Sequence, residues 1–131
     1  MLILLEIHSI VRWLIVVIGV VAIVKFVIGW VRKSAFDKMD RGLSSGFSGL
    51  MDLQVTLGFL YFFITGFGGA GFPLFRIEHL VMMLLAAVAG HTPIMFKKRA
   101  WNKHAVALGA IIVSLLLVYV GVMRLPGGWG R

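Results

Sequence analysis

Four long apolar stretches constrain this chain more than any other feature of its sequence. Each is close to the ~20 residues that an α-helix needs to cross a bilayer, and together they take up most of a chain in which 60% of the residues are hydrophobic. The stretches run from Ile10 to Val31, from Gly46 to Phe67, from Leu74 to Phe96 and from Ala105 to Met123. This pattern predicts an all-α integral membrane protein, a four-helix up-down-up-down bundle in which residues 1–131 form a single transmembrane domain.

The basic residues lie mainly between the apolar stretches. Arg32, Lys33, Lys38 and Arg41 fall between the first two, Lys97, Lys98, Arg99 and Lys103 between the last two, and Arg76, Arg124 and Arg131 on the other side. The positive-inside rule therefore predicts that both basic loops are cytoplasmic and that both termini are outside. The net charge of +8 does not indicate nucleic-acid binding, because the basic residues form no patch on a soluble face. The expected surroundings are the lipid bilayer.

Four histidines lie near the ends of the apolar stretches. The chain has no cysteine, which excludes disulfides, thiolate-ligated iron–sulfur clusters and c-type haem attachment and leaves histidine as the strongest available ligand. In the expected topology His8 and His79 lie near the outer face, and His91 and His104 near the inner face. His79 and His91 stand roughly 18 Å apart along one helix, at ~1.5 Å per residue. The sequence thus predicts two histidine pairs, one near each side of the membrane.

Paired imidazoles are the ligands that hold b-type haem between membrane helices. Haem also carries two propionates, and Arg12 and Arg76 each lie about one helical turn from a histidine of the outer pair. We therefore expect haem b, one or two groups. His8 and His79 would bind the outer iron, His91 and His104 would bind the inner iron, and Arg12 and Arg76 would contact the propionates. Against the inner pair, the spacing of His79 and His91 turns them by about 120° around the helix.

Other polar residues of the spans carry weaker expectations. Arg12 should face an anion inside the bundle, either Glu78 or a propionate, because an arginine within the membrane is costly otherwise. Lys25 should extend toward the cytoplasmic face, and Asp52 should form a salt bridge with a basic loop residue. Pro93 should kink or end the third helix soon after His91.

The sequence also leads to expectations for the structure of two loops and for a possible copper site. Residues 34–45 are expected to be a connector without a motif, and residues 66–73, which are rich in glycine, a flexible turn. The Met82 and Met83 pair beside His79 permits a copper site, although methionines in membrane helices commonly serve packing. No spacing of the His-Glu-x-x-His type indicates hydrolytic chemistry.

Three short motifs carry a family resemblance. They are His8-Ser9-Ile10-Val11-Arg12-Trp13, then Asp52-Leu53-Gln54-x-x-Leu57-Gly58, and then Glu78-His79-Leu80-x-Met82-Met83 extending to Gly90-His91. Together they resemble a small bacterial four-helix membrane family labelled cytochrome b. More distantly the pattern is similar to di-haem b-type bundles and to one half of haem A synthase. In the family's pattern a histidine stands where this chain has Asp52, and His104 is the residue that would substitute for it.

The resemblance implies a haem protein of the bacterial inner membrane that crosses it several times. The expected function is electron transfer, as a possible quinol-linked oxidoreductase, with a quinone or a respiratory complex as the redox partner and with homo- or hetero-oligomers allowed. The alternative, from another class, is a haem-free accessory or assembly subunit of a larger membrane complex.

Overall fold

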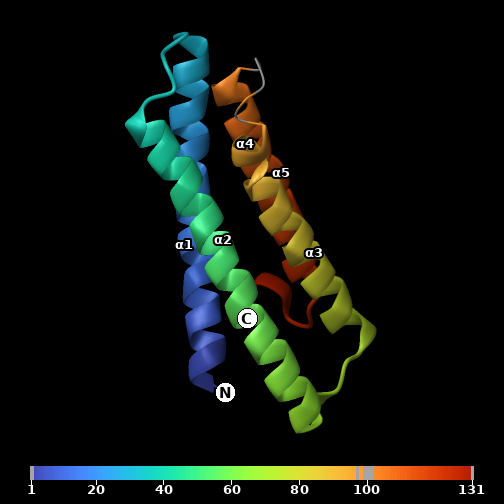
Figure 1. The fold of residues 1–131 in the computed structure, drawn as a ribbon. Coiled ribbons are helices and arrows are strands. Elements are labelled where there is room, and N and C mark those ends of the chain that lie inside the picture. Colours follow the sequence, from blue (N-terminus) through green and yellow to red (C-terminus); the bar gives the residue numbers. More distant parts are fainter. Residues whose placement is uncertain (1, 97, 99–101, 131) are drawn as a thin grey trace.

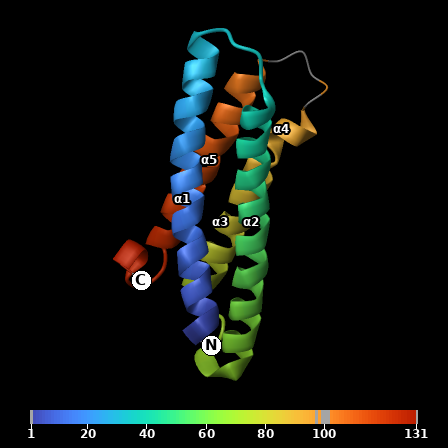
Figure 2. The same cartoon turned by 90° about the vertical axis from the view of Figure 1, so that its left-hand side faces the viewer.

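The computed structural model describes residues 2–96, 98 and 102–130, and its regular structure in these ranges is helical. The long helices run in alternating directions and lie side by side (Figures 1 and 2). The elements are α1 (Leu2–Val31), α2 (Lys38–Thr65), a π-helical turn η1 (Gly66–Ala70), α3 (Leu74–Gly90), the short α4 (Thr92–Met95), α5 (Lys103–Met123) and a 3₁₀ turn η2 (Gly128–Gly130). The all-α class expected from the sequence is confirmed.

Three helical segments are long and apolar enough to cross a bilayer, namely Ile3–Val31, Lys38–Ala70 and Lys103–Met123. They indicate a protein that passes through a membrane several times. The third apolar stretch of the sequence behaves differently, because α3 ends at Gly90 after 17 residues and α4 begins at Thr92. Pro93 explains the break, since proline has no N–H to donate and its ring clashes with the carbonyl of the preceding turn.

The core lies where the helices meet and combines large and small side chains. Phe26, Phe47, Ile15 and Met51 are fully buried. The α5 helix packs against both α3 and α1, and α2 packs against α1 and α3. The hydroxyl of Ser114 in α5 donates to the carbonyl of Ala86 in α3, which ties these two helices together inside the bundle.

The start of α2 corrects one expectation from the sequence. Residues 34–45 were expected to be a connector, but α2 begins at Lys38 and includes most of them. Asp37 is the N-cap, and its side chain accepts from the Asp40 amide at 2.9 Å while the Asp40 side chain accepts from the Asp37 amide at 3.0 Å. This reciprocal capping satisfies two amides that a helix start would otherwise leave without partners.

Candidate functional site

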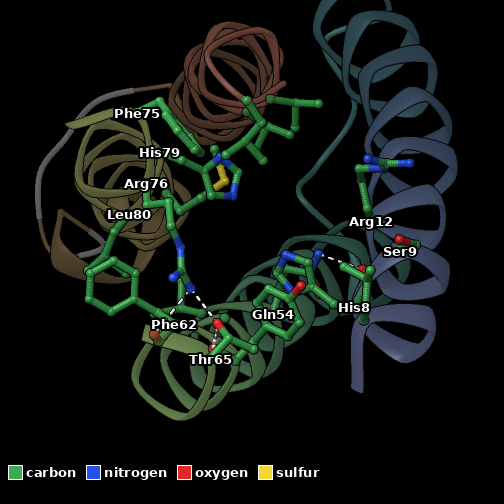
Figure 3. A pocket seen from close by; sticks show the side chains of 18 of the residues that line it. His8, Ser9, Arg12, Gln54, Phe62, Thr65, Phe75, Arg76, His79 and Leu80 are labelled. Atoms are coloured by element: carbon green, nitrogen blue, oxygen red, sulfur yellow. Dashed lines mark hydrogen bonds between the residues drawn. The ribbon is translucent and has the colours of Figure 1, made fainter. Parts of the chain in front are cut away.

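A cavity of about 410 Å³ lies between the helices at the end of the bundle that carries the N-terminus. Its volume falls within the ~300–1,000 Å³ that is typical of ligand pockets. Most of its lining is apolar, from residues such as Leu80, Met83 and Val118. The polar side chains that border it include five that are labelled in the close view of Figure 3, namely His8, Arg12, Gln54, Arg76 and His79.

His8 from α1 and His79 from α3 face this cavity together. Their ring centroids are 6.5 Å apart, and the ring planes are inclined at 74°. The Nδ1 atom of His79 lies 2.8 Å from the carbonyl oxygen of Gly121. Because a carbonyl oxygen only accepts, Nδ1 carries the proton, and Nε2 keeps the lone pair that can bind a metal. The outer histidine pair that the sequence predicts is therefore brought together.

Gly121 makes this arrangement possible for a steric reason. A Cβ atom at this position would overlap Met83 Cε and would lie 3.1 Å from Met82 Cβ. A larger residue would push α3 and α5 apart, and the carbonyl that orients His79 would move with α5. The two methionines thus pack against α5, although a copper site was one alternative for them.

Arg12 is buried, with 8% of its surface exposed. Its guanidinium carbon lies 5.4 Å from the Trp13 ring and 5.2 Å from the ring of Trp129 in η2. Both distances are within the ~6 Å reach of a cation–π interaction. Glu78, one of the two anions expected for Arg12, forms an ion pair with Arg124 at 3.0 Å.

Arg76 binds the end of α2. Its guanidinium donates to the carbonyl oxygens of Gly71 at 2.7 Å and Phe62 at 3.1 Å, and to Thr65 Oγ1 at 2.5 Å. The contacts with Phe62 and Thr65 are visible in Figure 3, and the contact with Gly71 holds the glycine-rich run against α3. That run, expected to be an open turn, is the π-helical turn η1, with a break at Gly69, where φ is 123°. The guanidinium of Arg76 was expected to contact a haem propionate. In the structure its N–H groups instead bond to the end of α2 and to the turn that follows it.

The two inner histidines are held by different carboxylates. His91 Nε2 lies 2.8 Å from Asp52 Oδ1, and His104 Nε2 lies 3.2 Å from Asp40 Oδ2. Each imidazole thus uses Nε2 to donate to an acid. The structure does not form the His91–His104 pair that the sequence predicts. Asp52 also differs from expectation, because its partner is a histidine and not a basic loop residue.

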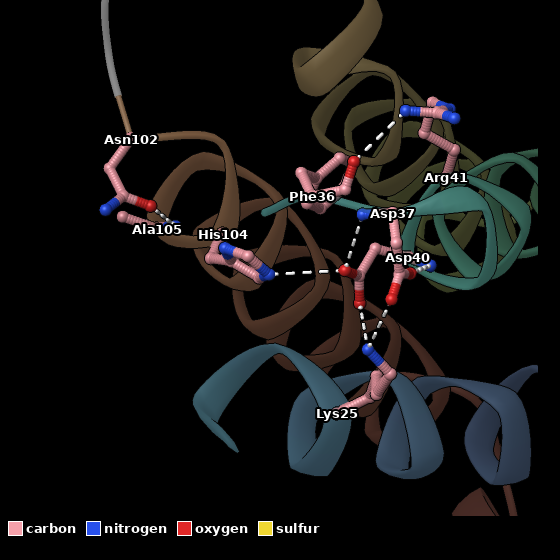
Figure 4. A network of polar contacts seen from close by, with 8 residues as sticks. All are labelled: Lys25, Phe36, Asp37, Asp40, Arg41, Asn102, His104 and Ala105. Atoms are coloured by element: carbon pink, nitrogen blue, oxygen red, sulfur yellow. Dashed lines mark hydrogen bonds and ion pairs between the residues drawn. The ribbon is translucent and has the colours of Figure 1, made fainter. Parts of the chain in front are cut away.

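The carboxylate of Asp40 is the centre of a buried polar cluster (Figure 4). It has no exposed surface, and it accepts from Lys25 Nζ at 2.9 Å as well as from His104. Lys25 also lies 3.5 Å from Asp37. Lys25 therefore extends toward the connection between α1 and α2, the side that was expected to be cytoplasmic, and its partners there are two carboxylates. Gly29 admits the His104 ring, since a Cβ there would overlap its Nε2 atom.

Two residues of these sites were missed from the sequence. Asp40 had a signal in the Asp37-x-x-Asp40 spacing, which is a variant of the capping box. Gln54, which is buried and donates to the carbonyl of His8 at 2.8 Å, had two signals: it is an amide in an apolar stretch, and it belongs to the second motif of the family resemblance. Its proximity to His8 depends on how α1 and α2 pack, which no local pattern predicts.

The described residues contain no group of three or more His, Asp or Glu side chains that could hold a metal ion by themselves. A site built on two imidazoles needs a group that supplies its own equatorial ligands, as haem does. The chain matches no family model, no curated protein and no solved structure. The resemblance to the cytochrome b family therefore rests on the sequence motifs alone.

Proposed function

We propose that this protein is similar to b-type cytochromes, that it holds haem between His8 and His79, and that it transfers electrons within the membrane. One observation carries the proposal, the separation of 6.5 Å between the two ring centroids at a largely apolar cavity. Imidazoles that bind opposite sides of one metal ion, through nitrogens about 2 Å from it, hold their centroids roughly 6 Å apart.

The residues around the cavity fit such a group. Haem bound there would supply one-electron transfer at its iron. Gly121 orients the His79 ring through Nδ1, so that Nε2 would be the atom that binds the iron. Arg12 supplies a buried positive charge that can meet an anionic edge, and the apolar lining excludes water from the iron's surroundings.

The proposal concerns one haem and not two. His91 and His104 each donate Nε2 to a carboxylate, Asp52 and Asp40 respectively. To bind iron through that atom, either histidine would have to break its pairing with the acid. An inner haem on the family's pattern is therefore not part of the proposal.

We further propose that α3 is a fourth membrane span and that both termini are outside, in the bacterial inner membrane. A helix of 17 residues is at the short end of the range of ~17–25 that crosses a bilayer, and α4 extends the segment. Single cysteines introduced into this cysteine-free chain test the orientation. Those at Gly69 and Gly128 should react with a membrane-impermeant thiol reagent in intact cells, and one at Lys98 should not. The reverse pattern would invert the topology.

The deciding experiment is to measure haem per chain by pyridine haemochrome in protein purified in mild detergent with haem supplied. We expect a value near one and the reduced spectrum of a low-spin bis-histidine b haem. A well-folded preparation with a value near zero would overturn the proposal and favour the haem-free accessory subunit. If haem is present, reduction by a quinol would test whether a quinone or a respiratory complex is the electron donor.

A further inference from the structure

Gln54 is a buried polar side chain of the cavity to which the sequence gave no role. It lies in α2, is 5% exposed and reaches across to α1, where its Nε2 donates to the backbone carbonyl of His8 at 2.8 Å. That carbonyl can only accept, so the nitrogen of the amide must point toward it. The orientation of the Gln54 amide is thereby assigned, and its oxygen Oε1 points the other way.

The Oε1 atom of Gln54 is buried and accepts no hydrogen bond from any residue that the structure describes. Leaving a buried acceptor unsatisfied is unfavourable, and such atoms commonly mark a functional contact. Gln54 lies beside His8 at the same cavity, as Figure 3 shows. The other histidine of the cavity, His79, donates its Nδ1 proton to the carbonyl of Gly121.

The structure does not form a hydrogen bond between Gln54 Oε1 and the His8 ring. We propose that Gln54 is a positioning residue for His8: a turn of the His8 ring from this position lets Gln54 Oε1 accept the Nδ1–H of the imidazole while Nε2 faces the haem iron. This inference rests on the proposed function. The two ligands would then be held alike, with one ring oriented by a backbone carbonyl and the other by a side-chain amide. Such a bond fixes the tautomer and makes the imidazole a stronger electron donor, which stabilises ferric over ferrous iron.

The reduction potential of bound haem separates this role from simple bracing of α1 against α2. Gln54→Leu removes the acceptor and should raise the midpoint potential. Gln54→Glu keeps an acceptor, so its potential should stay at or fall below that of the parent. Thr56→Val is the matched control, because Thr56 Oγ1 bonds to the Asp52 carbonyl on the same helix and does not line this cavity; its potential should equal the parent's. An unchanged potential in Gln54→Leu, or equal shifts in the Leu and Glu variants, would overturn the inference.

A second measurement needs no haem. Nitrogen NMR of the His8 imidazole in the haem-free protein should show the proton on Nδ1 in the parent and a loss of that preference in Gln54→Leu. If the folded parent binds no haem, the proposed function fails and the NMR result alone decides the role of Gln54. If haem binds but neither the potential nor the tautomer responds to Gln54→Leu, the inference fails and the proposed function stands.

Discussion

The two ends of the bundle treat their histidines differently. At the end that carries the N-terminus, His8 and His79 lie close together at a cavity, and the neutral amide of Gln54 bonds to the backbone carbonyl of His8. At the opposite end, His91 and His104 each donate to a carboxylate. An imidazole whose Nε2 donates to an acid has that atom occupied, whereas one anchored through Nδ1 can bind a ligand. The partner of each ring, more than its depth in the membrane, therefore separates the candidate site from the structural contacts.

Glycines contribute differently to the two ends as well. Gly29 lets the His104 ring lie against α1, close to the carboxylate of Asp40. Gly121 lets α3 approach α5 and offers its carbonyl to His79. At one end the close approach brings a histidine to an acid, and at the other it orients a histidine whose second nitrogen can bind a ligand.

The largest effect is expected when one histidine of the outer pair, His8 or His79, is replaced. If haem is held between His8 and His79, His8→Ala or His79→Ala should abolish the low-spin bis-histidine spectrum, because each variant would remove one of the two imidazoles that would hold the iron. His91→Ala, the matched change at the other end, should leave the spectrum and the haem content unchanged. Optical spectra of the three variants at equal haem supply measure this. Equal loss in all three would show that the two ends do not differ in the way proposed.

The next effect concerns the buried acid of the inner end. Asp40→Ala should lower the free energy of unfolding by about 3–5 kcal/mol, because it removes a buried carboxylate from two donors, Lys25 and His104. Asp37→Ala is the control, since it removes the N-cap at an exposed position and should cost about 1 kcal/mol. Denaturant titration in detergent micelles, followed by circular dichroism, gives both values. If Asp40→Ala were as stable as Asp37→Ala, the buried cluster around Asp40 would have no structural role.

A smaller effect is expected for the cation of the outer end. Arg12→Leu should cost about 1–2 kcal/mol of stability, because the contacts of the guanidinium with the rings of Trp13 and Trp129 are lost. It should also weaken haem binding, while Arg12→Lys should retain most of it. Thermal unfolding with and without haem separates the two contributions. An Arg12→Leu protein with the stability and haem content of the parent would show that the cation serves neither purpose.

The smallest effect is expected where histidine and acid are exposed. The side chain of Asp52 is 57% exposed, so water screens its bond to His91, and Asp52→Asn should cost less than about 1 kcal/mol. The comparison with Asp40→Ala in the same titration is the measurement. If the Asp52 variant were the less stable of the two, burial would not be what ranks the two histidine–acid pairs.

Much of the architecture follows from the sequence, because it depends on local properties. Apolar stretches near 20 residues long predict helices that could span a membrane, and Pro93 predicts where the third helix breaks, since both effects act within a few turns of the chain. The helix ends were predicted less well. The α2 helix starts at Lys38 and not near Gly46, because capping by Asp37 outweighs the polar character of the segment.

The contacts of the histidines divide between what the sequence determines and what only the tertiary structure decides. The number of apolar stretches and their alternating directions were enough to predict that His8 and His79 lie at the same end, because alternating helices return the chain to each side in turn. The same count also placed His91 and His104 together, yet it could not show that two acids compete for them. Asp40 is 64 positions from His104 along the chain, and the two meet only because Gly29 leaves room where α1, α2 and α5 converge. Which polar atom lies next to each imidazole is decided by helix packing over distances of a few ångströms, which no local pattern in the sequence encodes.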